Sequence, residues 1–166
     1  MDFVYKLIEV IVLGVVLVPT VYFSNILGKL IFERNVIKIK YHTDGIDMVQ
    51  YGDWIDLKSA EEVDKKKGEF KTISLGIGMK LPKNFEAHVV PRSSTFKTWG
   101  ILQANSMGVI DNKYSGNDDI WLFPAYATKK TSIKKGDRIC QFRIIEKANM
   151  KIEEVDSLDE VNRGGY

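Results

Sequence analysis

The stretch at 104–119, ANSMGVIDNKYSGNDD, has residue types and spacing suited to catalysis. Asp111 follows two β-branched residues, so it is predicted to end a strand. The residues after it, NKYSG at 112–116, supply turn chemistry that reverses the chain, and Tyr114 is expected at the tip of this hairpin. A carboxylate held there reaches a water and is suited to act as a general base. The plain alternative is that Asp111 only forms the turn.

Two other stretches contain polar side chains in or next to predicted strands. HVVPRSSTFKTWG at 88–100 includes Arg92, and KKGDRICQFRI at 134–144 includes Gln141. Asp56, in GDWIDL at 52–57, is an acidic residue in a predicted strand. Taken singly, Arg92 is explained by a surface ion pair, Gln141 by an ordinary polar strand position and Asp56 by a strand-end cap.

In this order, GDWIDL, PRSS, GVIDNKYSG and GDRICQF resemble the first four motifs of the trimeric dUTP nucleotidohydrolases (dUTPases). The resemblance runs from about residue 37 to the last residue and is strongest to dUTPases of Gram-positive bacteria and their phages. It implies hydrolysis of dUTP to dUMP and pyrophosphate, which limits uracil in DNA and supplies dUMP for dTMP synthesis. It also implies a homotrimer whose subunits share their active sites.

The resemblance assigns roles to individual residues. Asp111 activates the water that attacks the α-phosphate, and Tyr114 packs against the deoxyribose and excludes a 2′-hydroxyl. Asp56 supports Arg92 or the water shell of Mg²⁺, the implied cofactor, which is held through the triphosphate and water without a direct protein ligand. The implied substrate-binding residues are Arg92, Ser93, Ser94, Asn105, Gly108, Ile110, Tyr114, Gln141, Arg163 and Tyr166.

Two departures from the dUTPase pattern leave alternatives open. Ser94 stands where many family members have glycine, and Arg-Ser-Ser also resembles the dCTP deaminases, which carry a catalytic glutamate on the strand after the third motif. The run IWLF at 120–123 has no carboxylate. The C-terminal residues 161–166 look like the start of a truncated fifth-motif arm, with Arg163 placed to meet the γ-phosphate. A third hypothesis is a non-catalytic jelly roll that binds a nucleotide or a partner protein.

Composition excludes several other classes of function. Twenty-four basic and 22 acidic residues give a formal charge of +2. This nearly balanced charge does not indicate a protein that binds nucleic acid. The single cysteine, Cys140, excludes an intrachain disulfide and is expected to be a small buried side chain. His42 and His88 lack partners at zinc-ligand spacing.

Residues 37–160 are predicted to form one all-β domain. Alternating or apolar runs predict strands at 37–41, 52–57, 70–79, 85–91, 120–126 and 138–145, with Pro124 at an edge or a bulge. The stretch 43–50 is expected to be irregular, and the charged run 61–67 is expected to be a solvated loop. Many short strands indicate a sandwich or barrel. The family resemblance narrows this prediction to a distorted jelly roll of the β-clip type.

The first 36 residues form a separate hydrophobic segment. Residues 10–28 carry no charge and are rich in Val, Leu and Ile, and nineteen such residues are enough for an extra N-terminal helix that spans a bilayer. Lys6 precedes the stretch, and four basic residues follow it within 29–40, so the positive-inside rule predicts that the folded domain lies in the cytoplasm. The alternative is an extension produced by a mis-called start. A cleaved signal peptide fits less well.

Overall fold

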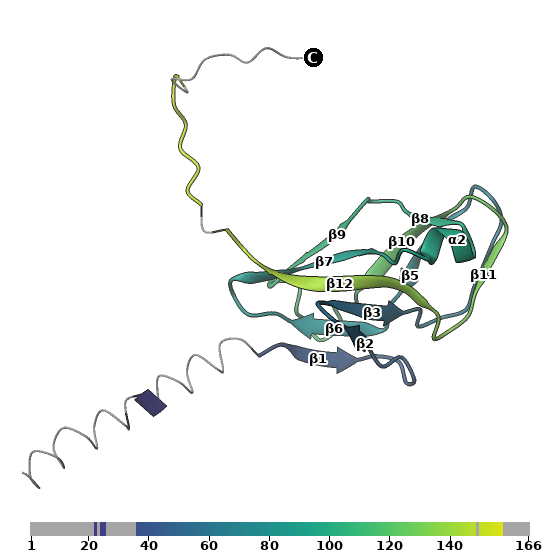
Figure 1. Cartoon of the computed structure of the whole chain (residues 1–166), viewed down its shortest axis with the longest axis horizontal. Helices are drawn as coiled ribbons and strands as arrows, with labels where there is room; N and C mark the ends of the chain where they lie inside the picture. Colours follow the sequence, from purple (N-terminus) through teal and green to yellow (C-terminus); the bar gives the residue numbers. More distant parts are fainter. Residues whose placement is uncertain (1–21, 23, 26–35, 149, 158–166) are drawn as a thin grey trace, which may run out of the picture.

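The computed structural model describes residues 22, 24–25, 36–148 and 150–157, and this part of the chain folds mainly into β-strands (Figure 1). The predicted all-β class is confirmed. Apart from helical residues at 22 and 24–25, the described helix is the short α2 (Thr95–Trp99), which the sequence patterns did not predict. The strands are β1 (Lys38–Tyr41), β2 (Val49–Tyr51), β3 (Trp54–Lys58), β4 (Val63–Lys65), β5 (Phe70–Ser74), β6 (Ile77–Lys80), β7 (Phe85–Pro91), β8 (Ile101–Gln103), β9 (Gly108–Asp111), β10 (Leu122–Ala127), β11 (Thr131–Ile133) and β12 (Arg138–Glu146).

The described strands form four sheets, and every strand pair is antiparallel. The largest sheet has the order β2-β3-β12-β7-β9, and a second sheet has the order β5-β10-β8. β1 pairs with β6, and β11 pairs with β4. The five-stranded sheet therefore carries all of the motif strands: Asp56 on β3, Gln141 on β12, Asp111 on β9, and the end of β7 that leads to Arg92.

The core lies under these sheets and is built from the inward-facing residues of the alternating strands. Trp121, Phe123 and Phe142 are each at most 1% exposed, and the Trp121 and Phe142 rings meet edge to face with centroids 5.1 Å apart. Burial of each such side chain contributes about 1.5–3 kcal/mol. Cys140 is fully buried in β12, and this burial raises the pKa of its thiol. The expectation of a small buried side chain at Cys140 is confirmed.

Three predicted boundaries are wrong, each for a local reason. The predicted strand at 70–79 is two strands, because Gly76 turns the chain with φ of 64° and lies against Ile46 and Ala60. The run at 61–67 contains β4 instead of only a loop, since buried Val63 pairs with Ile133. The stretch at 43–50 ends in the first residues of β2.

Pro124 lies in a central strand and not at an edge. β10 pairs with β5 on one side and with β8 on the other. Pro124 O accepts a hydrogen bond from Ala104 N at 2.8 Å, just beyond the end of β8. The missing N–H of the proline therefore faces the point at which β8 ends, and the pairing of β10 with β5 is not interrupted.

Two predicted segments fall largely outside the described residues. These are most of the N-terminal segment 1–36, including most of 10–28, and the C-terminal arm 161–166 with Arg163 and Tyr166. In the described part of the chain, no helix is both long enough and apolar enough to cross a membrane.

Candidate active site

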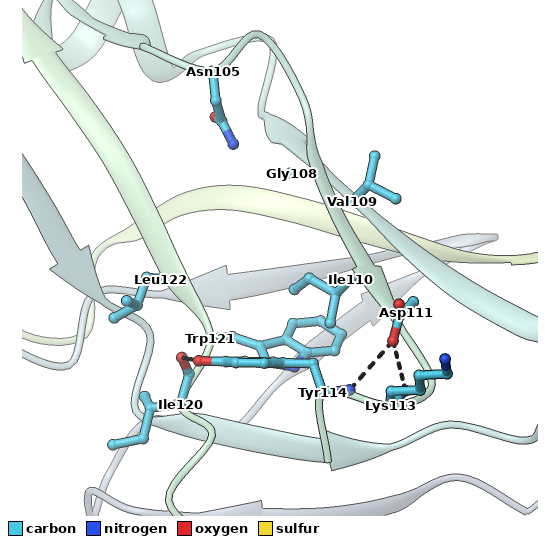
Figure 2. Close-up of a pocket in the computed structure, with 10 residues that line it drawn as sticks. All are labelled: Asn105, Gly108, Val109, Ile110, Asp111, Lys113, Tyr114, Ile120, Trp121 and Leu122. Atoms are coloured by element: carbon cyan, nitrogen blue, oxygen red, sulfur yellow. Dashed lines mark hydrogen bonds between the residues drawn. The ribbon is translucent and has the colours of Figure 1, made fainter. Parts of the chain in front are cut away.

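A cavity of about 590 Å³ lies between β9 and the start of β10 (Figure 2). This volume falls within the range of small-molecule sites. Five of the predicted site residues line it, and they come from the turn before β9, from β9 itself and from the loop after it. The full lining is Asn105, Gly108, Val109, Ile110, Asp111, Lys113, Tyr114, Ile120, Trp121 and Leu122.

Asp111 ends β9, as the sequence predicts, and its carboxylate closes the turn that follows. Oδ1 accepts hydrogen bonds from the backbone N–H of Lys113 at 2.6 Å and from that of Tyr114 at 3.3 Å. The Lys113 N–H is the main reason that the pKa of the Asp111 carboxyl lies below its ordinary value of 3.8. The side chain is exposed, and Oδ2 has no hydrogen-bond partner among the described residues. The carboxylate is therefore charged at neutral pH and presents one oxygen to water.

Tyr114 does not lie at the tip of a hairpin, and this part of the prediction is wrong. β9 pairs with β7 in the five-stranded sheet, whereas the chain after Asp111 crosses to β10 in the sheet β5-β10-β8. The Tyr114 hydroxyl donates to the carbonyl oxygen of Ile120 at 3.1 Å, so the ring lies across one side of the cavity (Figure 2). The residue remains 41% exposed, which leaves the ring accessible to a ligand.

The turn between β8 and β9 places Asn105 at the other end of the cavity from Asp111 (Figure 2). The N–H of Ser106 donates to Gln103 O at 3.1 Å, and Ser106 takes a positive φ of 61° to close this turn. A Cβ at Gly108 would lie 3.3 Å from the Val89 Cβ, so glycine allows β9 to lie close against β7. The backbone contacts of this turn and of β9 with β7 therefore fix the position of the cavity wall that β9 forms.

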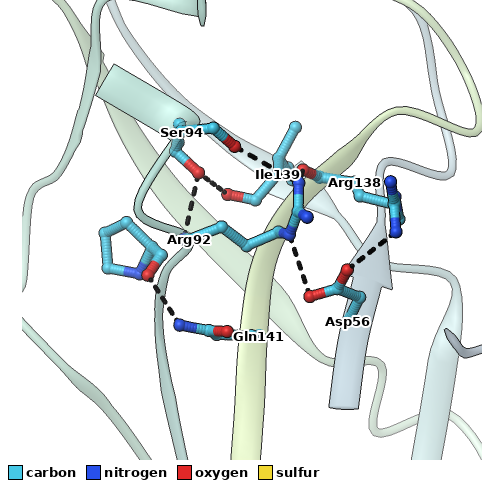
Figure 3. Close-up of polar contacts among 8 residues, drawn as sticks. Asp56, Arg92, Ser94, Arg138, Ile139 and Gln141 are labelled. Atoms are coloured by element: carbon cyan, nitrogen blue, oxygen red, sulfur yellow. Dashed lines mark hydrogen bonds and ion pairs between the residues drawn. The ribbon is translucent and has the colours of Figure 1, made fainter. Parts of the chain in front are cut away.

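A second group of predicted residues lies where β3, β7 and β12 meet (Figure 3). Arg92 Nε donates to Asp56 Oδ1 at 2.9 Å, and Arg138 Nη1 donates to Asp56 Oδ2 at 3.2 Å. Asp56 is 5% exposed, and its burial is tolerated because a guanidinium contacts each carboxylate oxygen. The arginines are partly exposed, so the group presents positive charge at the surface.

The sequence analysis missed two residues of this polar group, Arg138 and Thr95. Thr95 is fully buried, accepts from Arg92 N at 3.0 Å and donates to Ile139 O at 2.8 Å, so it ties the start of α2 to β12. Its partner Ile139 is 44 residues away, so no local pattern marks this threonine. For Arg138 a signal existed, since an arginine stands inside the GDRICQF motif.

The remaining predicted residues of this group differ in their contacts. Ser94 Oγ accepts from Arg92 Nη1 at 3.3 Å, and Gln141 Nε2 donates to Pro91 O at 3.4 Å. Ser93, which lies between Arg92 and Ser94 in sequence, is exposed. All three lie near the end of β7, so the structure brings these predicted phosphate-binding residues together.

The two groups of predicted residues lie at opposite ends of β7. Asp111 is opposite Glu86, at the start of that strand, and Arg92 directly follows Pro91, its last residue. Six residues of extended chain separate these positions, which is roughly 20 Å. One copy of the chain therefore does not bring Asp111 and Arg92 to the same small group of atoms.

Among the described residues, no three His, Cys, Asp or Glu side chains come together to hold a metal ion. Asp111 is the one carboxylate among the cavity-lining residues, and both oxygens of Asp56 contact arginines. Neither group thus supplies a set of carboxylates for a directly bound divalent cation.

Comparison of the sequence with known proteins identifies its family. The sequence profile of the dUTPase family matches residues 55–165. The chain is 56% identical over 134 residues to the SPbeta prophage-derived deoxyuridine 5'-triphosphate nucleotidohydrolase YosS of Bacillus subtilis strain 168, covering 78% of this chain and 94% of that protein. It is 37% identical over 132 residues to the deoxyuridine 5'-triphosphate nucleotidohydrolase of Clostridium novyi, covering 80% and 87%.

Solved structures show the same fold. A variant of the dUTPase from phage phi11 of S. aureus superposes with a TM-score of 0.65 at 14% identity, covering 76% of this chain and all of that chain. The dUTPase of Streptococcus mutans gives a TM-score of 0.61 at 20% identity, covering 68% and 98%. The predicted resemblance to dUTPases of Gram-positive bacteria and their phages is confirmed, and the chain belongs to the dUTPase family.

Proposed function

We propose that this protein hydrolyses dUTP to dUMP and pyrophosphate. Membership of the dUTPase family supports the reaction, and one observation in the structure carries the chemistry. Asp111 is ionised, its Oδ1 is fixed by two backbone N–H groups, and its Oδ2 is open to solvent beside a cavity of nucleoside size. A carboxylate with one fixed and one open oxygen is suited to orient a water and accept its proton.

In the proposed reaction the water oxygen attacks the α-phosphorus while Asp111 takes the proton. The bond to the bridging oxygen breaks, and pyrophosphate leaves with the electron pair. Arg92, Arg138 and Gln141 would stabilise the charge on the phosphate oxygens, because guanidinium groups bind such oxygens in pairs. Their contacts with Asp56 and Pro91 hold the donors in place before the ligand arrives.

The cavity would hold the nucleoside. Asn105 and the backbone of Gly108 and Ile110 would read the uracil edge, since fixed backbone groups give a constant hydrogen-bonding pattern. The exposed ring of Tyr114 would pack against the deoxyribose and leave no space for a 2′-hydroxyl. Ser93 and Ser94 would meet the phosphates.

Mg²⁺ is proposed as the cofactor. The phi11 dUTPase structure is described as coordinating a structural Mg(II) ion. The described residues of this chain provide no cluster of direct ligands, so the ion would be held by the triphosphate and by water. When bound in this way, Mg²⁺ neutralises charge on the phosphate oxygens.

The spacing along β7 supports active sites that are shared between subunits, as in the homotrimer that the family resemblance implies. The reacting water has to lie within hydrogen-bond reach of Asp111, while the phosphate oxygens have to contact Arg92 directly. A separation of roughly 20 Å along the strand is too long for one nucleotide to meet both demands within one copy. Asp111 of one subunit would therefore act with Arg92 of a neighbour.

A second feature supports the same assembly. The outer face of the sheet β5-β10-β8 exposes the neighbouring apolar residues Phe70, Leu102, Leu122 and Tyr126, which are 42–55% exposed. Tyr126 lies opposite both Phe70 and Leu102 in the strand register. An apolar face of this kind marks an interaction surface. Because Leu122 also lines the cavity, a subunit packed on this face would reach the rim of the active site.

Several predictions rest on the sequence alone. The catalytic domain is proposed to comprise residues 37–160. Arg163 and Tyr166 lie outside the described residues, so their contacts with the γ-phosphate and the uracil stay predictions. The same holds for a membrane anchor at residues 10–28 and for a domain facing the cytoplasm.

One assay tests the proposed function against its alternatives. Purified protein is incubated with dUTP, dCTP or UTP and Mg²⁺, and nucleotides, pyrophosphate and ammonia are measured. Pyrophosphate and dUMP from dUTP are expected. Ammonia from dCTP would show a deaminase, and no product from any nucleotide would show a binding protein. The Asp111→Asn variant serves as the control for a contaminating hydrolase.

A further inference from the structure

The loop that carries Tyr114, residues 112–121, lies between two hollows. On one side is the nucleoside cavity. On the other is a smaller hollow of about 200 Å³, formed by the strand pair β1–β6 and by residues 115–117 of the loop. The β1–β6 pair belongs to neither of the sheets that carry the predicted active-site residues. Its contacts with this loop therefore have no role in the chemistry described so far.

Lys40 of β1 holds the loop by a direct hydrogen bond. Its Nζ donates to the backbone oxygen of Asn117 at 2.8 Å across 77 residues of sequence. The loop is also closed on itself: Gly116 N donates to Asp119 Oδ2 at 2.6 Å, and the Tyr114 hydroxyl donates to Ile120 O at 3.1 Å. Because these contacts join the loop into one unit, its attachment at Asn117 also fixes the position of the Tyr114 ring.

Gly78 of β6 holds the loop by close approach. It lies opposite Lys40 in the strand register, and a Cβ at this position would lie 2.7 Å from the backbone oxygen of Asp119. The same Cβ would lie 3.4 Å from His42 Nε2. The first contact is with backbone, which cannot turn away as a flexible side chain would. Any larger residue at Gly78 would therefore push the loop outward.

Two neighbouring lysines provide a natural comparison. Lys38 and Lys80 face each other across the β1–β6 pair, line the same hollow and carry the same charge as Lys40. Neither makes a hydrogen bond to any described part of the loop. Their removal changes the local charge as much as removal of Lys40 but leaves the loop attached.

We propose that Lys40 and Gly78 are positioning residues that set the selectivity of the site for deoxyribose over ribose, by holding the 112–121 loop against the β1–β6 pair. This inference rests on the proposed function and on the role of Tyr114 in excluding a 2′-hydroxyl. Loss of the Lys40 contact loosens the middle of the loop, whereas its end stays attached to β6 through Trp121 N, which donates to Ile77 O at 2.7 Å. The loosened loop allows the Tyr114 ring to move away from the sugar, which opens space for that hydroxyl. The selectivity of the site thus depends on a strand that precedes all of the sequence motifs.

The test compares kcat/KM for dUTP and for UTP in the full-length protein. Lys40→Met is expected to lower the ratio of these constants about three- to tenfold, the usual net effect of losing one ordinary hydrogen bond, because this contact is exposed to solvent. The loss is expected mainly as a higher KM for dUTP. Lys40→Arg keeps a donor and is expected to keep most of the ratio. Gly78→Ala is expected to lower the ratio more than Lys40→Met does.

Lys38→Met and Lys80→Met are the matched controls and are expected to leave the ratio unchanged. If either control variant lowers the ratio as much as Lys40→Met does, the effect comes from the loss of charge, and the inference is overturned. If Gly78→Ala fails to fold, the four lysine variants decide the question. Wild-type protein that hydrolyses neither nucleotide would instead overturn the proposed function, and this inference with it.

A double variant separates positioning from a general loss of stability. In the Tyr114→Ala background the ring is gone, so adding Lys40→Met is expected to change the ratio no further. A second full decrease in the double variant would show that Lys40 acts independently of Tyr114, which would overturn the proposal.

Discussion

Asp111 both forms a turn and presents a charged oxygen to solvent. The two tasks do not compete, because the turn uses Oδ1 and leaves Oδ2 open. The hydrogen bonds that close the turn also favour the charged form of the carboxylate. They make it a weaker base than an ordinary aspartate, so accurate placement of the water has to supply much of its effect.

The Asp111→Asn variant tests the role of this residue. The amide oxygen still accepts the two backbone hydrogen bonds, so the fold and dUMP binding are expected to be nearly unchanged. Turnover is expected to fall by roughly 10²–10⁴, the range for loss of a general base. Pyrophosphate release under saturating dUTP and Mg²⁺ measures this directly. A variant with more than about half of the wild-type rate would exclude Asp111 as the base.

The pKa of Asp111 provides a second prediction. The Lys113 backbone N–H is the main cause of the lowered pKa, and the charge of the Lys113 side chain contributes least. Lys113→Ala is therefore expected to leave the pKa below 3.8, as followed by carboxyl carbon NMR shifts. Because a lowered pKa stabilises the fold only above it, this contribution is lost as pH falls through the folded-state pKa. An Asp111 titration at or above 3.8 in the wild type would contradict the assignment.

At the scale of elements, α2 and β12 are joined through one buried hydroxyl. Thr95 Oγ1 accepts from Arg92 N and donates to Ile139 O. The short helix has no side-chain cap from Ser94, so this contact is what connects its first turn to the sheet. The end of β7 that is proposed to bind phosphate therefore depends on a residue that need not touch the substrate.

Thr95→Val is expected to lower the free energy of unfolding by about 1–3 kcal/mol, since Arg92 N and Ile139 O would lose their partner while remaining inside the fold. KM for dUTP is expected to rise, because Arg92 is less well positioned. Thr95→Ser keeps the hydroxyl and loses one methyl group, so it is expected to lower the free energy of unfolding by only about 0.8 kcal/mol. Denaturant unfolding and steady-state kinetics measure both effects. Equal behaviour of the two variants would show that the hydroxyl is unimportant.

At the scale of the whole molecule, the proposed sharing of active sites predicts complementation between inactive variants. Asp111→Asn and Arg92→Ala are each expected to be inactive. When they are unfolded together and refolded at equal amounts, about one quarter of the sites would combine an intact Asp111 with an intact Arg92 from a neighbour. Recovery of about that fraction of the wild-type rate is therefore expected. An inactive mixture in which differently tagged copies of the two variants co-purify as one trimer would contradict shared sites.

Deletion of residues 1–36 tests the proposed domain division. The described strands begin at Lys38, and the described core contains no residue before Ile46. The shortened protein is therefore expected to fold and to hydrolyse dUTP at the rate of the full-length protein. Circular dichroism and pyrophosphate release check this, and an unfolded product would show that the β domain needs the N-terminal segment.

The sequence alone was sufficient for the all-β class and for most of the strands, because alternation and turn chemistry are local properties. It also placed Asp111 at a strand end, since its neighbours set that position. Local patterns did not reveal the pairing of β9 with β7, the central position of Pro124, or the roles of Thr95 and Arg138. These depend on partners far away in sequence, such as Ile139 for Thr95 and Asp56 for Arg138. Only the tertiary structure showed that β1 and β6 hold the Tyr114 loop, because Lys40 and Asn117 are 77 residues apart and meet only when the sheets pack.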